Sequence, residues 1–391
     1  MPALPRLPLA LYLLALAVFA MGTSEFMLAG LVPPIAVDLG VSVGAAGLLT
    51  SAFAVGMVVG APAMAAFARR WPPRATLLGC VVVFALCHVV AATTPDFAVL
   101  LATRVVAAVA NAGFLAVALA TATRIVPPDR TGRAVAVLLS GTTIAMVVGV
   151  PAGSLLGTAL GWRSTFWAVA LLCVPAALGI VLGVRVGRVV DPDERHTPLG
   201  RELAALRAPR LLVVLLLAAL ANGGTFAAFT FLAPVVTETA DLGEAWVSVA
   251  LVLFGVGSFL GVTAAGRLAD QHARTTLLAA TPLAVLGWAL LALLAAHPVA
   301  LLGLVLAQGA AAFLVGSVLI ARALHAATDA PTMGGSYATA ALNLGATVGP
   351  ALGAVAIAGA GARGPLGVAV ALSALALVVL LGARRVVVPR E

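Results

Sequence analysis

The stretch Phe53-Ala-Val-Gly-Met-Val-Val-Gly60 returns later in the 391-residue chain as Phe254-Gly-Val-Gly-Ser-Phe-Leu-Gly261. Three other short matches accompany it: Leu31-Val-Pro-Pro with Leu232-Ala-Pro, Asp38-Leu-Gly with Asp241-Leu-Gly, and Arg74-Ala-Thr-Leu-Leu with Arg274-Thr-Thr-Leu-Leu. All four pairs are separated by 200–203 residues. Chance could supply one such match in a sequence rich in Gly, Ala and Val, but four matches in register indicate a duplication.

The composition excludes an ordinary soluble protein. The chain is 63% hydrophobic and 9% charged, whereas soluble domains are about 45–50% apolar and about 25% charged. Lipid must therefore be its solvent. The net charge of +8 comes from 22 basic residues, all of them Arg, against 14 acidic residues. These arginines do not gather on one soluble face, so we expect no nucleic-acid partner.

Twelve apolar runs are long enough to cross a bilayer as helices, since about 20 apolar residues span it and only helices or closed barrels satisfy their backbone there. The runs lie at about residues 9–31, 43–68, 75–94, 97–120, 134–159 and 164–184, and then at 211–236, 245–266, 275–295, 298–320, 333–358 and 365–382. The sequence therefore predicts an all-α membrane protein with two pseudo-symmetric six-helix bundles, at 1–184 and 211–391, joined by a cytoplasmic linker at 185–210.

The arginines also predict the orientation. With the N-terminus inside, nineteen arginines fall on the cytoplasmic side and only Arg163 and Arg363 fall outside. Because cytoplasmic loops carry the excess of Arg, both termini are expected in the cytoplasm of a multi-pass inner-membrane protein. The first run is longer than the apolar region of a signal peptide and has no evident cleavage site, so we expect it to remain as a span.

Two charged residues stand inside these runs, Glu25 in the first and Arg104 in the fourth. Such residues cost roughly 2.5–3.5 kcal/mol to insert and mark ion, proton or substrate pathways. Each lies about seven residues from the predicted outer end of its helix, so we expect both at a depth of roughly 10 Å. Burial favours the neutral acid and a nearby Arg favours the carboxylate, so we interpret Glu25 as a protonation switch. A permanent structural ion pair is the alternative.

Isolated amides and aromatic rings in the apolar runs are candidates for a drug-binding cavity, since a neutral drug needs donors, acceptors and aromatic surface. The candidates are Asn111, Asn222, Gln308 and Asn343, with Phe26, Phe114, Phe226, Phe229 and Phe313. The alternative is interhelical hydrogen bonding for the amides and plain packing for the rings. We interpret His88 as a packed or lipid-edge residue.

Several motifs resemble those of the major facilitator superfamily. The loop Gly266-Arg-Leu-Ala-Asp270-Gln-His-Ala-Arg274 is similar to its cytoplasmic signature, which implies an inner gate that uses Gly266, Asp270 and Arg274. The first-half loop from Arg69 to Arg74 departs from this pattern, with Arg in place of the Asp and Pro in place of the Gly, and leaves Arg74 as its matching residue.

Helices four and five carry further matches. Leu100-Leu-Ala-Thr-Arg104 resembles the family's membrane-buried Arg motif, and Gly149-Val-Pro151-Ala-Gly153-Ser-Leu-Leu-Gly157 resembles its exporter-type Gly/Pro motif. Gly345-Ala-Thr-Val-Gly349-Pro350-Ala-Leu-Gly353 is the counterpart in the second half. Glycines at spacing four let helices approach closely and proline bends them, so we expect packed hinges here.

The strongest resemblance is to bacterial chloramphenicol-resistance exporters of the twelve-helix drug/proton antiporter group. It is carried by Gly22-Thr-Ser-Glu25-Phe-Met-Leu-Ala-Gly-Leu-Val-Pro33, Ala46 to Gly56, Ala110-Asn111-Ala-Gly-Phe, Gly161-Trp-Arg-Ser-Thr-Phe-Trp and Gly335 to Asn343. The resemblance implies a monomeric, cofactor-free antiporter that exports a small neutral drug, chloramphenicol, by alternating access driven by the proton gradient.

Two alternatives remain. Relatives with a similar Gly-Thr-x-Glu-Phe start export sugars or other metabolites. A membrane-embedded enzyme or receptor is disfavoured, because the sequence shows no catalytic triad, no metal-ligand cluster and no P-loop, and no extramembrane segment exceeds the 26 residues of the linker.

Overall fold

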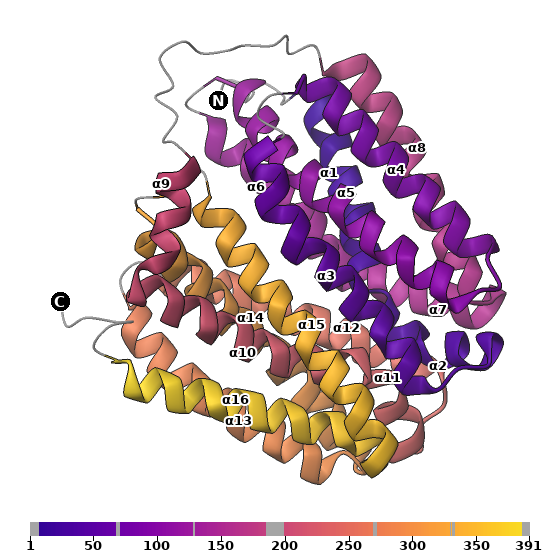
Figure 1. Ribbon diagram of the computed structural model, residues 1–391. Coiled ribbons are helices and arrows are strands. Elements are labelled where there is room, and N and C mark those ends of the chain that lie inside the picture. The colour runs from indigo at the N-terminus through magenta and orange to yellow at the C-terminus, as the bar shows by residue number, and fades with distance from the viewer. Residues whose placement is uncertain are drawn as a thin grey trace, which may run out of the picture.

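The computed structural model describes residues 8–67, 71–127, 130–184, 199–268, 272–328, 330 and 333–384. Within these ranges the chain is helical and contains no strand. Two helical bundles lie side by side, the first in indigo to magenta and the second in red to yellow (Figure 1). The predicted all-α class is confirmed.

The first half contains six spans, two of which are interrupted. They are α1 (Leu9–Phe26) with α2 (Leu28–Leu39), α3 (Val43–Phe67), α4 (Pro73–Thr93), α5 (Phe97–Arg124), α6 (Thr131–Ile144) with the π-helix η3 (Ala145–Gly149) and α7 (Val150–Leu160), and α8 (Trp162–Gly183). In the part of the linker that the structure describes, α9 (Leu199–Ala204) and the 3-10 turn η4 (Ala205–Arg207) follow.

The second half repeats this layout. Its spans are α10 (Pro209–Thr230) with α11 (Leu232–Pro234) and the π-helix η5 (Val235–Thr239), α12 (Ala245–Leu268), α13 (Ala273–Leu294), α14 (Pro298–Ala326), α15 (Gly334–Ala360), and α16 (Gly364–Gly382) after the 3-10 turn η6 (Gly361–Arg363). The first span of each half is therefore interrupted, at Met27 and at Phe231.

The described residues contain eleven apolar helical stretches of membrane-spanning length, one of which runs for 49 residues from Gly334 to Gly382. At 1.5 Å per residue a single helix of that length would measure about 70 Å, more than twice the hydrocarbon core. Since η6 interrupts it, α15 and α16 are two spans, and the predicted twelve are confirmed.

One predicted boundary is wrong by a full two turns. The first span does not end near residue 31 but continues as α2 to Leu39, with Pro33 and Pro34 inside the helix. Ile35 and Ala36 beyond the prolines are buried, so packing retains a helix in which two backbone N–H groups are missing. The helix stops at Gly40, whose φ of +63° is the left-handed conformation that ends helices.

The repeated sequence makes the same contact in both halves. A methyl group at Gly56 would collide with the carbonyl of Val105, and one at Gly257 with the carbonyl of Leu306. Each glycine therefore lets the second span of its half press against the fourth, α3 against α5 and α12 against α14. Close approach of this kind is how helices associate in lipid, where no hydrophobic force drives them together.

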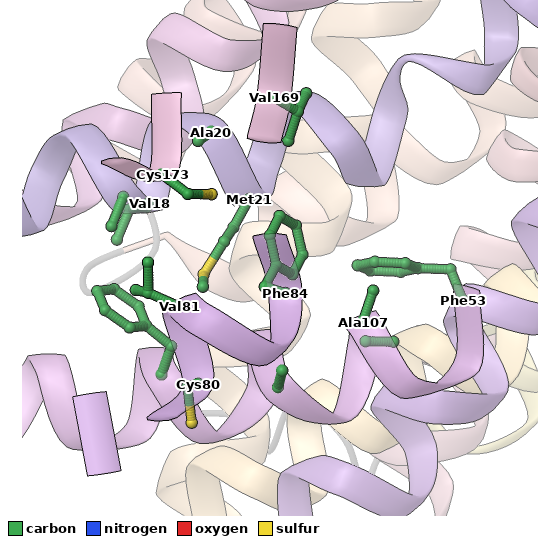
Figure 2. Close-up of a cluster of buried hydrophobic side chains, with 14 of the residues drawn as sticks. Val18, Ala20, Met21, Phe53, Cys80, Val81, Phe84, Ala107, Val169 and Cys173 are labelled. Carbon is green, nitrogen blue, oxygen red and sulfur yellow. The ribbon is translucent and has the colours of Figure 1, made fainter. Parts of the chain in front are cut away.

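Figure 2 shows part of the hydrophobic core of the first bundle, with side chains from α1, α3, α4, α5 and α8. Met21 of α1, Phe53 of α3, Phe84 of α4 and Val169 of α8 are almost completely buried in it. Ala107 of α5 lies beside the ring of Phe53. This packing holds α1, α4 and α5 at a fixed separation, which decides what the polar side chains beside it can reach.

The two halves meet along α3 with α15 and along α12 with η3 and α7. A methyl group at Gly44 would lie 2.8 Å from the carbonyl oxygen of Ala354, and Ser51 Oγ donates a 2.8 Å hydrogen bond to the carbonyl of Thr347. On the other side, a methyl group at Gly255 would lie 2.5 Å from the carbonyl oxygen of Met146. The backbones of the two halves are therefore in close contact along both of these lines, which we call the seams between the halves.

The linker docks on the second half through a buried acid. Glu202 of α9 is fully buried, and its carboxylate accepts a 2.8 Å hydrogen bond from the backbone N–H of Met333, directly before α15. Tyr337 donates its hydroxyl to the carbonyl of Glu202 at 3.0 Å. Residues 185–198 of the predicted linker lie outside the described residues.

At the opposite end of the molecule, Asp38 ties three spans of the first half together. Its carboxylate accepts hydrogen bonds from Arg163 and from Trp162 Nε1, and Arg163 also donates to the carbonyl of Thr94 at 3.1 Å.

The close glycine contact between α12 and α14 can be tested with a matched pair of substitutions. Gly257→Val should lower the free energy of unfolding by about 2–3 kcal/mol, since the added side chain meets rigid backbone of α14. Gly303→Val is the control, because Gly303 is exposed on α14 with open space around it. Thermal melting in detergent, followed by tryptophan fluorescence, measures both. Equal melting temperatures for the two variants would contradict the close contact between α12 and α14.

Candidate functional site

Three consecutive residues in the last turn of α1 face three different surroundings, because neighbours on a helix point about 100° apart. Ser24 is fully buried inside the first bundle, and Glu25 is half-buried. Phe26 packs across the seam, with its ring centroid 5.9 Å from that of Phe226 in the second half. The site is therefore a point where one bundle's interior touches the other bundle.

Arg104 of α5 is bound to Ser24 and not to Glu25. Its Nη1 donates to Ser24 Oγ at 2.7 Å and its Nη2 to the Ser24 carbonyl at 2.8 Å. The guanidinium carbon stacks 4.4 Å from the ring centroid of Phe53, and the side chain is 1% exposed. No ion pair joins Arg104 to Glu25, although the structure describes both side chains. The permanent ion pair considered above is thus not present.

His88 extends this network on α4. Its Nε2 lies 2.7 Å from Ser24 Oγ, and its Nδ1 lies 2.7 Å from the carbonyl oxygen of Phe84. The side chain is 1% exposed, so its placement at the lipid edge is wrong, while the alternative of a packed residue is confirmed. No sequence signal identifies its partner, because Ser24 lies 64 positions away.

Glu25 has a single, long hydrogen bond. Asn111 Nδ2 lies 3.5 Å from Glu25 Oε2 and 3.7 Å from the sulfur of Met57. Asn111 and Arg104 both reach from α5 to α1. The helical segment continues fourteen residues beyond Glu25, to Leu39, and not about seven residues as the sequence predicted.

Aromatic rings from both halves meet beside Glu25. Phe26 contacts Phe226 and Phe229, with centroids 5.9 and 6.4 Å apart, and Phe229 contacts Phe254 at 4.6 Å. Phe313 lies 6.2 Å from Phe254. These five residues, which we call the aromatic group, include four of the predicted cavity rings. Phe254 was missed, although it is the repeat partner of Phe53.

Phe114 does not belong to the aromatic group. It is fully buried within the core of the first bundle, in the same cluster as Phe84 and Met21. It therefore packs α5 against its own bundle and does not face the second half. An aromatic residue in an apolar helix carries no sequence signal that distinguishes these two environments.

The remaining amides bond to backbone. Asn222 Nδ2 donates to the carbonyl of Leu342 at 2.7 Å, and Gln308 Nε2 to the carbonyl of Ala284 at 3.0 Å. Asn343 Nδ2 donates to Thr339 of its own helix at 3.0 Å. Gln308 is 2% exposed and joins α14 to α13 within one bundle, which matches the interhelical alternative. Asn222 is half-buried and joins α10 to α15.

The Gly/Pro motif of the fifth span packs on the first span. Gly149, Gly153 and Gly157 face Thr23, Met27 and Leu31 in turn, each four residues further along. The π-helix η3 ends at Gly149, two residues before Pro151, where the missing N–H of proline disturbs the helical ladder. In the second half, Gly349 lies against the carbonyl of Gly223, and Pro350 follows inside α15.

The predicted gate residues are only partly described. Gly266 lies exposed in the last turn of α12 and Arg274 in the first turn of α13. Asp270, like Arg69 and Arg70, lies outside the described residues. Arg74 donates a 2.5 Å hydrogen bond to the carbonyl of Val181 at the end of α8. It therefore closes the end of its own bundle in this structure.

The charged residues have no counterpart in the second half. At the repeat offset of 201 residues, Phe226 stands where the first half has Glu25, and Val305 stands where it has Arg104. Both are buried. The duplicated scaffold therefore holds its ionisable site in one half and places aromatic and aliphatic side chains in the other.

Known proteins resemble this chain over nearly its whole length. Residues 14–262 match the family model of the Major Facilitator Superfamily. The chain is 61% identical to a chloramphenicol resistance protein of Streptomyces lividans over 382 residues, 97% of each chain. It is 32% identical to a chloramphenicol efflux pump of Mycobacterium tuberculosis over 273 residues, 69% of this chain and 65% of that one.

A solved structure shows the same fold. A bacterial homologue of the human lysosomal transporter Spinster, in an inward-facing and occupied conformation, superposes with a TM-score of 0.74 over 96% of each chain at 19% identity. On the family match, the relatives and this architecture together, the chain belongs to the major facilitator superfamily of membrane transporters.

Proposed function

We propose that this protein exports chloramphenicol from the cytoplasm in exchange for protons. The observation that carries the proposal is the place of Glu25: a half-buried acid beside a buried Arg, next to the residue that contacts the other half. The drug is inferred from the relative that is 61% identical over almost the whole chain. A sugar or another metabolite is the alternative cargo.

The polar surroundings of Glu25 support the proton step. In this conformation its carboxyl is held only by Asn111, and Arg104 is occupied by Ser24. A neutral acid tolerates this environment, whereas a carboxylate needs Arg104 close by. Movement of the second half against Phe26 would displace the end of α1 and change which of these states is favoured.

The aromatic group supports the binding of a neutral drug. Phe26 comes from one half and Phe226 and Phe229 from the other, so a ring inserted among them would bridge the halves. Asn111, beside Glu25, adds a hydrogen-bond donor for a hydroxyl or amide. Binding there would replace contacts that now join the halves, and would thereby couple the drug to their movement.

The setting follows from the same proposal. We place the protein in the cytoplasmic membrane with both termini inside, acting as a monomer without a cofactor and without catalysis. The seams between the halves lie within one chain, so a single copy contains both sides of the site. The protein then needs only the drug, protons and the lipid bilayer.

Glu25→Gln should uncouple transport from the proton gradient. In inside-out vesicles with an acidic interior, drug uptake should fall by about tenfold or more, since an amide cannot carry the proton and a missing transport step costs at least one factor of ten. Exchange of labelled for unlabelled drug needs no net proton movement and should persist. Glu238→Gln, the same change at an exposed acid, is the control and should transport normally. Coupled uptake by Glu25→Gln would remove this residue from the mechanism.

The cargo can be tested in cells. A chloramphenicol-sensitive host that expresses the protein should accumulate less chloramphenicol, and a protonophore should restore accumulation. Cells that express Glu25→Gln should accumulate the drug like cells without the protein. Unchanged accumulation in cells with wild-type protein would discard chloramphenicol as the cargo and favour the sugar or metabolite alternative. Chemically modified drug in the medium would indicate an enzyme.

A further inference from the structure

The contacts between Arg104, Ser24 and His88 form one directed hydrogen-bond chain. The carbonyl of Phe84 can only accept, so His88 Nδ1 carries the proton and donates to it at 2.7 Å. Arg104 can only donate, so Ser24 Oγ accepts from it. A protonated ring would place a second buried cation beside the guanidinium, which is disfavoured, so Ser24 turns its own proton toward His88 Nε2, also at 2.7 Å. His88 Nε2 is therefore an acceptor, and the ring is neutral.

We propose that Ser24 and His88 are positioning residues that hold the guanidinium of Arg104 away from Glu25, and so set the pH at which Glu25 takes up its proton. The inference rests on the proposed proton exchange. Neither residue touches the drug or carries the transported proton. Their role is to determine whether the guanidinium of Arg104 lies close enough to Glu25 to stabilise its carboxylate.

The geometry leaves Arg104 a second position. Its Nε, which is buried, has no hydrogen-bond partner among the described residues, so the guanidinium is not fully satisfied on Ser24. Glu25 is the next residue along α1, and among the described residues its carboxyl is hydrogen-bonded only to Asn111, at 3.5 Å. Because Ser24 and Glu25 are neighbours on α1, a turn of the Arg104 side chain would exchange one acceptor for the other.

Few other ionisable groups face this site. The elements packed on α1 include α3 and α7, which carry none, and α8, which adds Cys173 near mid-span and Arg163 at its outer end. Behind the network, α4 adds Cys80 and Cys87 besides His88, with Arg74 in its first turn about four turns from His88, and α2 adds Asp38 at its far end. In α6 the ionisable residue is Arg133, more than two turns from the residues beside Gly22. Among the described residues, Arg104 is the nearby cation whose position can change the charge of Glu25.

The proton balance follows directly. While Arg104 stays on Ser24, the carboxylate of Glu25 lacks a counterion and takes a proton from water to become the neutral acid. When Arg104 moves to Glu25, the acid releases that proton to water and the ion pair forms. Ser24 and His88, which we call the holding site, keep their own protons in both positions of Arg104. The holding site therefore acts by competing with Glu25 for Arg104 and is not consumed.

The pH profile of drug transport in proteoliposomes tests the inference. Ser24→Ala and His88→Phe weaken the holding site, so Arg104 should spend more time at Glu25 and keep it ionised. The midpoint pH of proton-dependent uptake should fall by about one unit, which corresponds to a tenfold lower proton affinity. His88→Gln retains a donor and an acceptor and should leave the midpoint within about 0.3 units of wild type.

The controls separate this inference from the function on which it rests. The shift of the midpoint pH should vanish when Ser24→Ala is combined with Glu25→Gln. For this double variant, transport is measured as exchange of labelled for unlabelled drug. If Ser24→Ala and His88→Phe fold normally by thermal melting and keep the wild-type midpoint, the holding site is wrong and proton exchange stands. If His88→Gln shifts as far as His88→Phe, ring packing against Phe84 and Phe166 explains the effect, and the inference is again overturned. If wild-type uptake does not depend on pH, the proposed function itself fails.

Discussion

A buried guanidinium cannot remain without acceptors in an apolar bundle, and the arrangement around Arg104 follows from this constraint. The acceptors come from one residue of α1, Ser24, whose hydroxyl and carbonyl both receive N–H groups of Arg104. The hydroxyl accepts from Arg104 and donates its own proton to His88. A single cation therefore fixes the relative rotation of α1, α4 and α5 and orients Glu25 toward Asn111.

Close helix packing makes such a fixed arrangement possible. The glycines of the repeated segment bring α3 onto α5, which places Phe53 under the guanidinium of Arg104. The same contact in the second half brings α12 onto α14 and places Phe254 among the aromatic group. Duplication thus supplied one scaffold twice, and the side chains at matching positions gave the two copies different chemistry.

The number of spans, the duplication and the two charged residues could be predicted, because hydrophobicity, spacing and the cost of a buried charge are all local or periodic signals. The partner of Arg104 could not. Ser24 and Glu25 are adjacent, and no sequence signal indicates which of the two the guanidinium binds. Phe114 and Phe226 look alike in sequence, yet one packs inside its bundle and the other faces the opposite half. The end of α2 was missed because tertiary packing retained a helix through two prolines.

The asymmetry of the site bears on how a symmetric scaffold can be driven in one direction. If both halves held an acid and an Arg, protonation would favour neither half and the two would titrate together. Here the first half has Glu25 and Arg104, whereas the second has Phe226 and Val305 at the matching positions. The ring of Phe226 instead rests on Phe26, the neighbour of Glu25. In the proposed exchange, one half changes its charge while the other half responds through packing, and that division of roles requires the duplicated halves to differ at these positions.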